Sequence, residues 1–351
     1  GLRHRNEGAQ MLDVHNVSDG MFRLPIVLNF SGYRVFCPSE LQYNPPPPKN
    51  TPREKHTMPK ITAFGEILWD NLPTGKVLGG APVNLLTHLA ALGADCSVIS
   101  RCGNDADGAA LREAIRRKHV AIDFIQTDPQ LATSQVLVQL NDEGCAHYDI
   151  VYPCAWDKIQ AGEAAKTRVA QSDVFIFGSL SVRDAVSRQA LAELLPHASF
   201  KIFDVNLRPP HYRLADLRDM MRQADFIKLN DDELHEIATA LGSPYRSIEQ
   251  NIRFIAEHTH TRQICVTLGK HGALYFCDGE LFAHYGYRVT VADTVGAGDS
   301  FLAGFIHQYL QRKPPQEILA FACALGSLVA SRHGATPEVS LAEIEAMMNP
   351  Q

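Results

Sequence analysis

Apolar and polar residues follow two periods along most of this chain, and together they predict a mixed α/β structure. Short runs that are apolar throughout indicate buried strands, and we predict them at 61–65, 96–100, 174–177, 201–204, 226–229 and 263–268. Other stretches repeat apolar residues at helical spacing, and we predict helices at 83–92, 107–118, 184–195 and 231–241. Buried strands that alternate with amphipathic helices imply a mostly parallel sheet with helices on both faces.

One region breaks this alternation. Residues 136–140 form a strand-like run, polar residues follow at 141–144, and a second strand-like run comes next. Two such runs around a short polar turn predict an antiparallel β-hairpin. We therefore expect a small lid built from residues 69–82 and 121–156. Its exposed strand edges could also pair with a second copy of the chain in a homodimer.

Residues 1–57 differ from the rest of the chain. They show no clear periodicity and contain a run of prolines at 45–48, which favours extended, unpaired backbone. They contain no basic stretch followed by an apolar core, so we do not expect a secretory signal. The first predicted strand begins shortly after Met58, and we expect one domain over 58–351. The preceding segment is then either a disordered appendage or the product of a start site misread upstream.

Composition narrows the class of protein. The 351 residues, 45% of them hydrophobic, suffice for one large α/β domain or two ordinary ones. The formal net charge of −6 argues against a nucleic-acid binder, and no apolar run approaches the roughly 20 residues of a membrane span. We expect a soluble cytoplasmic protein with neither kind of partner. The eight scattered cysteines predict buried thiols in a reducing compartment and no zinc site.

The segment 293–301, Asp-Thr-Val-Gly-Ala-Gly-Asp-Ser-Phe, carries the clearest chemistry. Apolar residues recur after it at helical spacing, so its Gly-Ala-Gly turn opens a helix with Asp299 in the first turn. Free N–H groups at a helix start bind anions, and small residues let a ligand approach the backbone. A carboxylate beside such a site can accept a proton from an attacking hydroxyl, which suits phosphoryl transfer. The alternative is that Asp299 only caps the helix.

A second polar cluster follows the first predicted strand. Asp70 lies five residues after Gly65, and the turn at Gly79 and Gly80 leads into a helix near Asn84. Strand ends and helix starts of this kind form the ligand-binding edge of open α/β sheets. The carboxylate and amide groups there are suitable partners for sugar hydroxyls. In the alternative interpretation the glycines form an ordinary turn and Asn84 is a helix cap.

Further segments place polar residues or glycines after predicted strands, at 204–208, 228–233 and 267–272. Two prolines follow Arg208 and end regular structure, so its side chain either faces a ligand anion or pairs with Asp204. The acidic residues of 231–233 could simply complement a helix dipole. The turn at 102–108 we interpret as structural.

In this order, these segments resemble the signatures of PfkB or ribokinase-like carbohydrate kinases, and the resemblance spans about 61–337. It implies a ribokinase-like three-layer αβα sandwich with a mostly parallel central sheet and a small β lid. It implies ATP-dependent phosphorylation of a sugar hydroxyl, with Asp299 as the catalytic base. The family signature Asp-Thr-x-Gly-Ala-Gly-Asp is complete, which assigns an anion hole to Gly296, Ala297 and Gly298. The resemblance also places Arg208 near the transferred phosphate or the substrate.

The same resemblance assigns binding roles to the other segments. It implies that the sugar is held by Asp70, Gly79, Gly80 and Asn84. It implies that ATP is bound by Lys228, Asn230, Thr267, Gly269, Gly272 and Gly298. Metal ions would be organised by Asn230 and Glu233 (Mg²⁺, largely through water) and by Asp293 (a monovalent cation, with K⁺ as the candidate). Because Glu338 stands where ribokinases often have serine, dependence on K⁺ is left open. Trp156 and Tyr148 either cover the sugar or belong to the core.

Fructose is the leading substrate. The sequence Gly-Gly-Ala-Pro-x-Asn at 79–84, with Gly-Glu-Ile-Leu-Trp-Asp before it, is similar to bacterial fructokinases, and Ala81 stands where ribokinases usually carry lysine. This resemblance implies phosphorylation at the 6-hydroxyl. The alternatives are a kinase for 2-keto-3-deoxygluconate, ribose or another sugar, and a non-catalytic sugar- or nucleotide-sensing relative. The motifs of P-loop kinases and of dinucleotide-binding dehydrogenases are missing from the positions they require.

Overall fold

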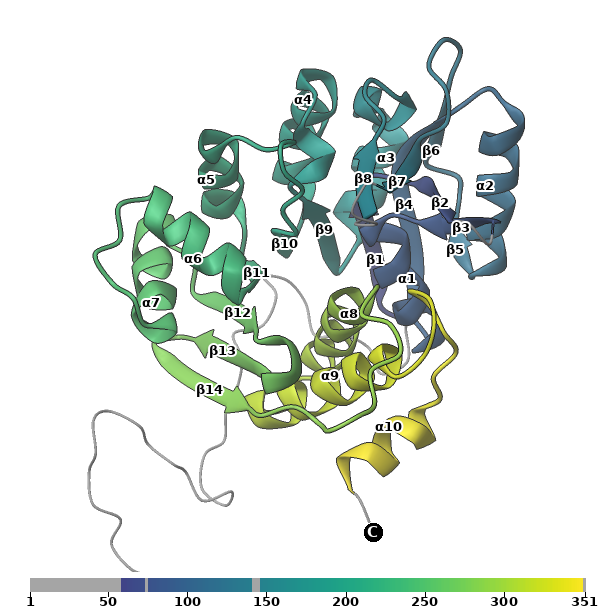
Figure 1. Cartoon of the computed structure of the whole chain (residues 1–351). Helices are drawn as coiled ribbons and strands as arrows, with labels where there is room; N and C mark the ends of the chain where they lie inside the picture. The colour runs from purple at the N-terminus through teal and green to yellow at the C-terminus, as the bar shows by residue number, and fades with distance from the viewer. Residues whose placement is uncertain (1–57, 73–74, 141–145, 350–351) are drawn as a thin grey trace, which may run out of the picture. The chain divides into compact units, whose positions relative to one another are not determined.

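The computed structural model describes residues 58–72, 75–140 and 146–349, with backbone alone at 137–140 and 146–149. The predicted appendage, 1–57, lies outside the described residues. A ten-stranded sheet forms the centre (Figure 1). In spatial order its strands are β14 Glu280–His284, β13 Ala273–Cys277, β12 Gln263–Thr267, β11 Phe226–Asn230, β10 Lys201–Asp204, β9 Val174–Gly178, β1 Lys60–Phe64, β4 Asp95–Gly103 and β5 Val120–Ala121, with β6 Ile125–Asp128 also paired to β4.

The sheet is parallel from β12 to β5, and only β13 and β14 are antiparallel to their neighbours. Its central strands are apolar throughout because both of their faces are covered. Phe226 lies against Phe305 of one helical layer, with ring centroids 4.8 Å apart. Ile227, the next residue of the same strand, belongs to the core on the opposite face. This arrangement confirms the predicted strands and the predicted layers.

Helices form the two outer layers. One layer contains α1 Ala81–Ala91, α8 Ala297–Leu310 and α9 Pro315–Ala330, with α10 Leu341–Met348 packed on α9. The other contains α3 Glu163–Gln171, α4 Ala185–Leu194, α5 Leu214–Gln223, α6 Asp231–Ala240 and α7 Ile248–Thr259 (Figure 1). Helix α2 Ala106–Arg117 packs beside β4 and β5. Short 3-10 turns are η1 Ala155–Lys158, η2 Leu180–Val182, η3 Leu195–His197 and η4 Gly269–His271. The helices predicted at 83–92, 107–118, 184–195 and 231–241 are confirmed within two residues.

A second, four-stranded sheet forms the lid, with its strands in the order β3-β2-β7-β8. These are β2 Leu68–Leu72, β3 Gly75–Gly79, β7 Gln135–Leu140 and β8 Ala146–Ile150. Strands β7 and β8 are antiparallel, as the predicted hairpin requires, and β2 joins β7 in parallel. The lid is narrower than the predicted 121–156, because β6 pairs with β4 of the large sheet instead. Dimerisation through the edge strands β3 and β8 stays a prediction.

Two expectations from composition can be compared with the described residues. The cysteines there are buried free thiols, as predicted: Cys96, Cys102, Cys154, Cys265, Cys277 and Cys323. No helix in the described part of the chain has the length and apolar character needed to cross a membrane.

Candidate active site

The Gly-Ala-Gly turn forms a helix start with unbonded amides. Gly296 has φ 76°, a left-handed conformation, and a Cβ there would overlap the Ala335 carbonyl. Helix α8 begins at Ala297, whose amide donates to Thr294, and the amide of Ser300 donates to Gly296. Among the described residues, the amides of Gly298 and Asp299 have no backbone acceptor. The turn therefore offers N–H groups to an anion, as the sequence predicts.

The Asp299 side chain is hydrogen-bonded to a different helix, α1. Its Oδ2 accepts a hydrogen bond from Asn84 Nδ2 at 3.0 Å, and the N-cap position belongs to Gly296, which makes no side-chain cap bond. The capping alternative therefore does not describe this residue. Burial and the nearby Asp204 carboxylate raise the pKa of Asp299 to about 6, although Lys228, Asn84 and Arg208 act in the opposite direction. A base with such a pKa is ionised at neutral pH yet accepts a proton readily.

A buried ion pair brings a cation to the turn. Lys228 Nζ lies 3.0 Å from Asp204 Oδ1, and both side chains are 7% exposed. A Cβ on Gly298 would lie 3.3 Å from the same ammonium, so the absence of a side chain at Gly298 lets the charge approach the amides. Burial tends to lower the pKa of Lys228, but Asp204, Glu233 and Asp299 reverse this and raise it. The ammonium stays charged where phosphoryl charge would develop.

Arg208 is not the partner of Asp204, which pairs with Lys228 instead. The Arg208 side chain is exposed, and its Nη1 donates to the carbonyl of the preceding Leu207 at 2.9 Å. Its charge nevertheless lowers the pKa values of Asp70 and Asp299. The guanidinium therefore lies within electrostatic range of both Asp70 and Asp299.

The residues predicted to bind sugar lie on the β2–β3 hairpin and at the start of helix α1. Asp70 opposes Val77 across the β2–β3 hairpin, and its carboxylate occupies the space that a Cβ on Gly79 would need. Burial raises the pKa of Asp70, and Arg208 opposes that shift. Asn84 is buried in the first turns of α1, and its Oδ1 has no hydrogen-bond partner among the described residues. An unpaired buried acceptor beside the base is a suitable place for a sugar hydroxyl.

Glu66 is a site residue that the sequence analysis missed. Its side chain is 5% exposed, and Oε1 accepts a hydrogen bond from the amide of Ala81 at 3.3 Å. Burial raises its pKa to about 7, while Arg208 lowers it and Asp299 raises it. A signal was present, because Glu66 follows the first buried strand directly, within the segment that carries Asp70.

On the nucleotide side, Asn230 and Thr267 are register partners at the ends of the adjacent parallel strands β11 and β12. The loop after β12 depends on glycine: Gly269 has φ 54°, Gly272 has φ 90°, and a Cβ on Gly272 would overlap the His284 carbonyl. The predicted ATP-binding residues thus meet at the carboxyl edge of the sheet, next to Lys228 and the start of α8.

The two residues assigned to Mg²⁺ form a helix cap. Asn230 Oδ1 accepts from the Glu233 amide, and Glu233 Oε2 accepts from the Asn230 amide, each at 2.8 Å. The other oxygen, Glu233 Oε1, accepts from the Leu207 amide at 2.8 Å. Both carboxylate oxygens are thus engaged by backbone. These residues fit Mg²⁺ only through water, since the ion keeps several waters when it binds few carboxylates.

Asp293, the residue predicted to hold a monovalent cation, also accepts hydrogen bonds from backbone amides. Its Oδ1 accepts from the Val295 amide at 3.0 Å and its Oδ2 from the Gly334 amide at 3.1 Å. The carboxylate therefore joins the loop before α8 to the loop that contains Gly334. A carboxylate is an oxygen ligand of the kind that suits a hard cation, so Asp293 itself is compatible with K⁺.

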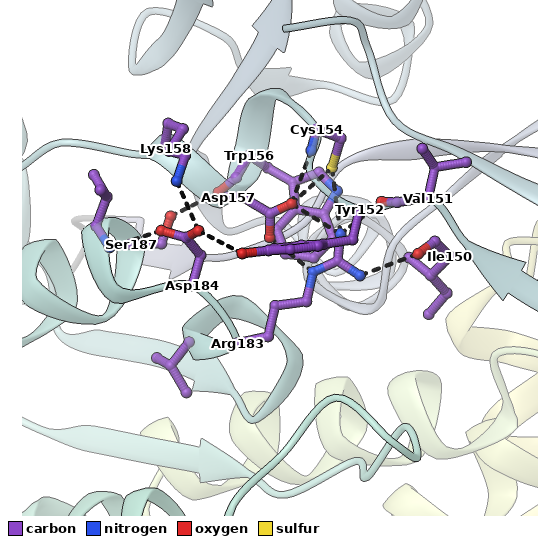
Figure 2. Close-up of polar contacts among 12 residues, drawn as sticks. Ile150, Val151, Tyr152, Cys154, Trp156, Asp157, Lys158, Arg183, Asp184 and Ser187 are labelled. Atoms are coloured by element: carbon purple, nitrogen blue, oxygen red, sulfur yellow. Dashed lines mark hydrogen bonds and ion pairs between the residues drawn. The ribbon is translucent and has the colours of Figure 1, made fainter.

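The suggestion that Trp156 covers the sugar is wrong. Its side chain is 0% exposed and lies beneath the Arg183 guanidinium, whose central carbon is 4.1 Å from the ring centroid (Figure 2). Trp156 belongs to the core, as the alternative held. The side chain of Tyr148 lies outside the described residues.

Comparison with known proteins identifies the family and the fold. The model for "pfkB family carbohydrate kinase" matches residues 61–341. The chain is 28% identical over 314 residues to "Probable fructokinase-6, chloroplastic" of Arabidopsis thaliana, covering 81% of each chain. It is 28% identical over 297 residues to a fructokinase of Salmonella typhimurium, covering 79% of this chain and 94% of that one. A structure of a Xylella fastidiosa fructokinase with bound ATP shares the fold, with TM-score 0.72, 23% identity, and coverage of 83% of this chain and 98% of that chain.

Proposed function

Because the chain belongs to the pfkB family of carbohydrate kinases, we propose that it transfers the terminal phosphoryl group of ATP to D-fructose, giving fructose 6-phosphate. The observation that carries this proposal is the position of Asp299 at the mouth of the Gly-Ala-Gly turn, held by Asn84 at 3.0 Å. A base and an anion site at one helix start are the two parts that phosphoryl transfer to an alcohol requires.

In the proposed mechanism the sugar binds between the sheet edge and the lid, with Asp70 and Asn84 as partners for its hydroxyls. Asp299 removes the proton of the attacking hydroxyl as the oxygen bonds to the γ-phosphorus and the bond to ADP breaks. The amides of Gly298 and Asp299, together with the Lys228 ammonium, stabilise the charge that develops on the phosphoryl oxygens. Arg208 adds a second cation from the exposed side.

The nucleotide is proposed to lie along the loop 267–272, beside Asn230. Bound Mg²⁺ would neutralise phosphate charge there, reached by Asn230 and Glu233 through water. Asp293 would hold K⁺ at the loop before α8. One fructokinase structure with this fold, from Vibrio cholerae, contains fructose, ADP and potassium, which supports the choice of K⁺.

The choice of fructose over other sugars is supported by the turn Gly79-Gly80-Ala81-Pro82 and by the names of the relatives. The test is a panel of fructose, ribose, glucose, 2-keto-3-deoxygluconate and adenosine, assayed for ADP release with Mg²⁺, with and without K⁺. We expect the highest kcat/KM on fructose, and a 6-phosphate product by NMR. A strong preference for another acceptor would discard fructose, and no turnover on any would count against catalysis itself.

A further inference from the structure

A buried carboxyl group lies where the first strand of the large sheet ends. The Gly65 amide donates to the Ile99 carbonyl at 3.2 Å, and Ser100 Oγ donates to the Gly65 carbonyl at 2.6 Å. Strand β4 therefore holds the end of β1 in place. Glu66 comes directly after Gly65 and is only 5% exposed. The proposed reaction assigns no task to this residue.

Glu66 contacts the sugar-binding turn twice. Its Oε1 accepts from the Ala81 amide at 3.3 Å, and its carbonyl oxygen would lie 2.6 Å from a Cβ on Gly80. Gly80 has φ 110°, so both its conformation and its contact with Glu66 depend on glycine. The side chain and the backbone of Glu66 together determine where this turn lies.

The Gly80–Ala81 turn also positions Asp299, the proposed base. Gly80 is the first acceptor of α1, because its carbonyl receives the amides of Val83 at 3.1 Å and Asn84 at 3.0 Å. One turn into this helix, Asn84 donates its side-chain amide to Asp299 at 3.0 Å. Hydrogen bonds and close contacts thus run without a gap from Glu66 through Gly80 and Asn84 to Asp299.

We propose that Glu66 is a positioning residue for phosphoryl transfer: its carboxyl group holds the Gly80–Ala81 turn in the place from which Asn84 fixes Asp299. The proposal rests on the role of Asp299 in the proposed function. It assigns Glu66 to the acceptor side of the reaction, so its loss affects sugar binding and the base but not ATP binding.

The carboxyl group of Glu66 also lies among other charged groups. Arg208 and Asp299 face Glu66 from other elements, and Asp204 lines the same narrow cavity while paired to Lys228. Burial is the largest cause that raises the pKa of Glu66, and the Asp299 carboxylate raises it further, because two buried carboxylates disfavour each other's charge. The pKa of Glu66 is brought to about 7, above the value of about 6 for Asp299, so Glu66 is already protonated where Asp299 titrates.

The test compares Glu66→Gln with Glu66→Ala, using the sugar that the wild type phosphorylates best. The Gln side chain keeps an acceptor for the Ala81 amide and removes the charge. We expect its KM for sugar to stay within about threefold and the acidic limb of its kcat/KM profile to stay near pH 6, because Glu66 is already uncharged in that range. The Ala variant removes the acceptor, and we expect its KM for sugar to rise about tenfold with KM for ATP unchanged.

Ser247→Ala is the matched control, because Ser247 caps α7 through the Gln250 amide far from this site. It should lower stability with no effect on either KM. An Ala variant with normal KM for sugar, or a Gln variant whose KM for sugar rises as far as that of the Ala variant, would overturn the role of Glu66 while wild-type turnover upholds the proposed function. A wild type inactive on every sugar would overturn both.

Discussion

Two arginines, Arg183 and Arg208, come from loops at the carboxyl ends of neighbouring strands and have opposite surroundings. Arg183 is 3% exposed and forms a two-point ion pair with the fully buried Asp157, at 2.7 and 2.9 Å (Figure 2). It also donates to the carbonyls of Ile150 and Val151, and so joins the end of lid strand β8 to the large sheet. Its donors are used within the protein.

Arg208 is exposed and donates within the described structure to the carbonyl beside it. Its charge nevertheless acts on Glu66, Asp70 and Asp299. This guanidinium lies at a strand end near several carboxyl groups, and most of its donors are not used within the described structure. It is therefore suited to binding an incoming phosphate. The comparison separates an arginine that builds the fold from one that is available to a substrate, and residue type alone does not distinguish them.

The largest effect is expected on stability from Arg183→Ala. The change leaves Asp157 buried without its cation, which costs about 3–5 kcal/mol in the free energy of unfolding. Urea denaturation followed by circular dichroism measures it. The double variant Arg183→Met with Asp157→Leu should recover most of the loss, because neither charge is then buried alone. A single variant as stable as the wild type would contradict the structural role of this pair.

Arg208→Ala should have the reverse signature. We expect kcat to fall by about 10²–10³-fold, as for loss of one donor to transition-state charge. Unfolding free energy should change by less than about 0.5 kcal/mol, because the side chain is exposed. Arg213→Ala is the control, since Arg213 is 65% exposed and pairs only locally with Asp216. Equal activity in the two variants would show that Arg208 has no part in the reaction.

A smaller effect is expected from pH. Asp299 acts only when ionised, and its pKa is raised to about 6 mainly by burial. The kcat/KM for the sugar should therefore be constant near neutral pH and fall about tenfold per unit below pH 6. Rates measured from pH 5 to 8 test this. A limb near pH 4, the ordinary range of an aspartate, would mean that Asp299 is solvated or is not the base.

The sequence predicted elements better than it predicted neighbours. Uniformly apolar strands and helical periodicity located the sheet and the helices, because those patterns are local. It did not show that β6 pairs with β4 or that Trp156 lies under Arg183, because both depend on contacts between distant segments. The position of Glu66 directly after the first strand was a local signal, but its burial was not visible in the sequence. That burial, and the effect of Asp299 on its pKa, arise from packing between distant segments.

Within the candidate site, the helix start at the Gly-Ala-Gly turn was predictable because it is encoded in consecutive residues. The surroundings of the residues proposed for Mg²⁺ were harder to predict. Asn230 and Glu233 match the family pattern, yet their side chains accept hydrogen bonds from backbone amides as a helix cap. The choice between an Arg208–Asp204 pair and a free Arg208 also needed the structure, because Lys228 comes from the next strand and takes Asp204.

The most direct test of the account is the kcat of Asp299→Asn on the preferred sugar, measured beside sugar and ATP binding by calorimetry. The amide keeps an oxygen for the Asn84 donor but cannot take up the hydroxyl proton. The account predicts a kcat lower by about 10²–10⁴-fold with both affinities changed less than threefold. A kcat within tenfold of the wild type, with binding intact, would contradict the assignment of Asp299 as the base.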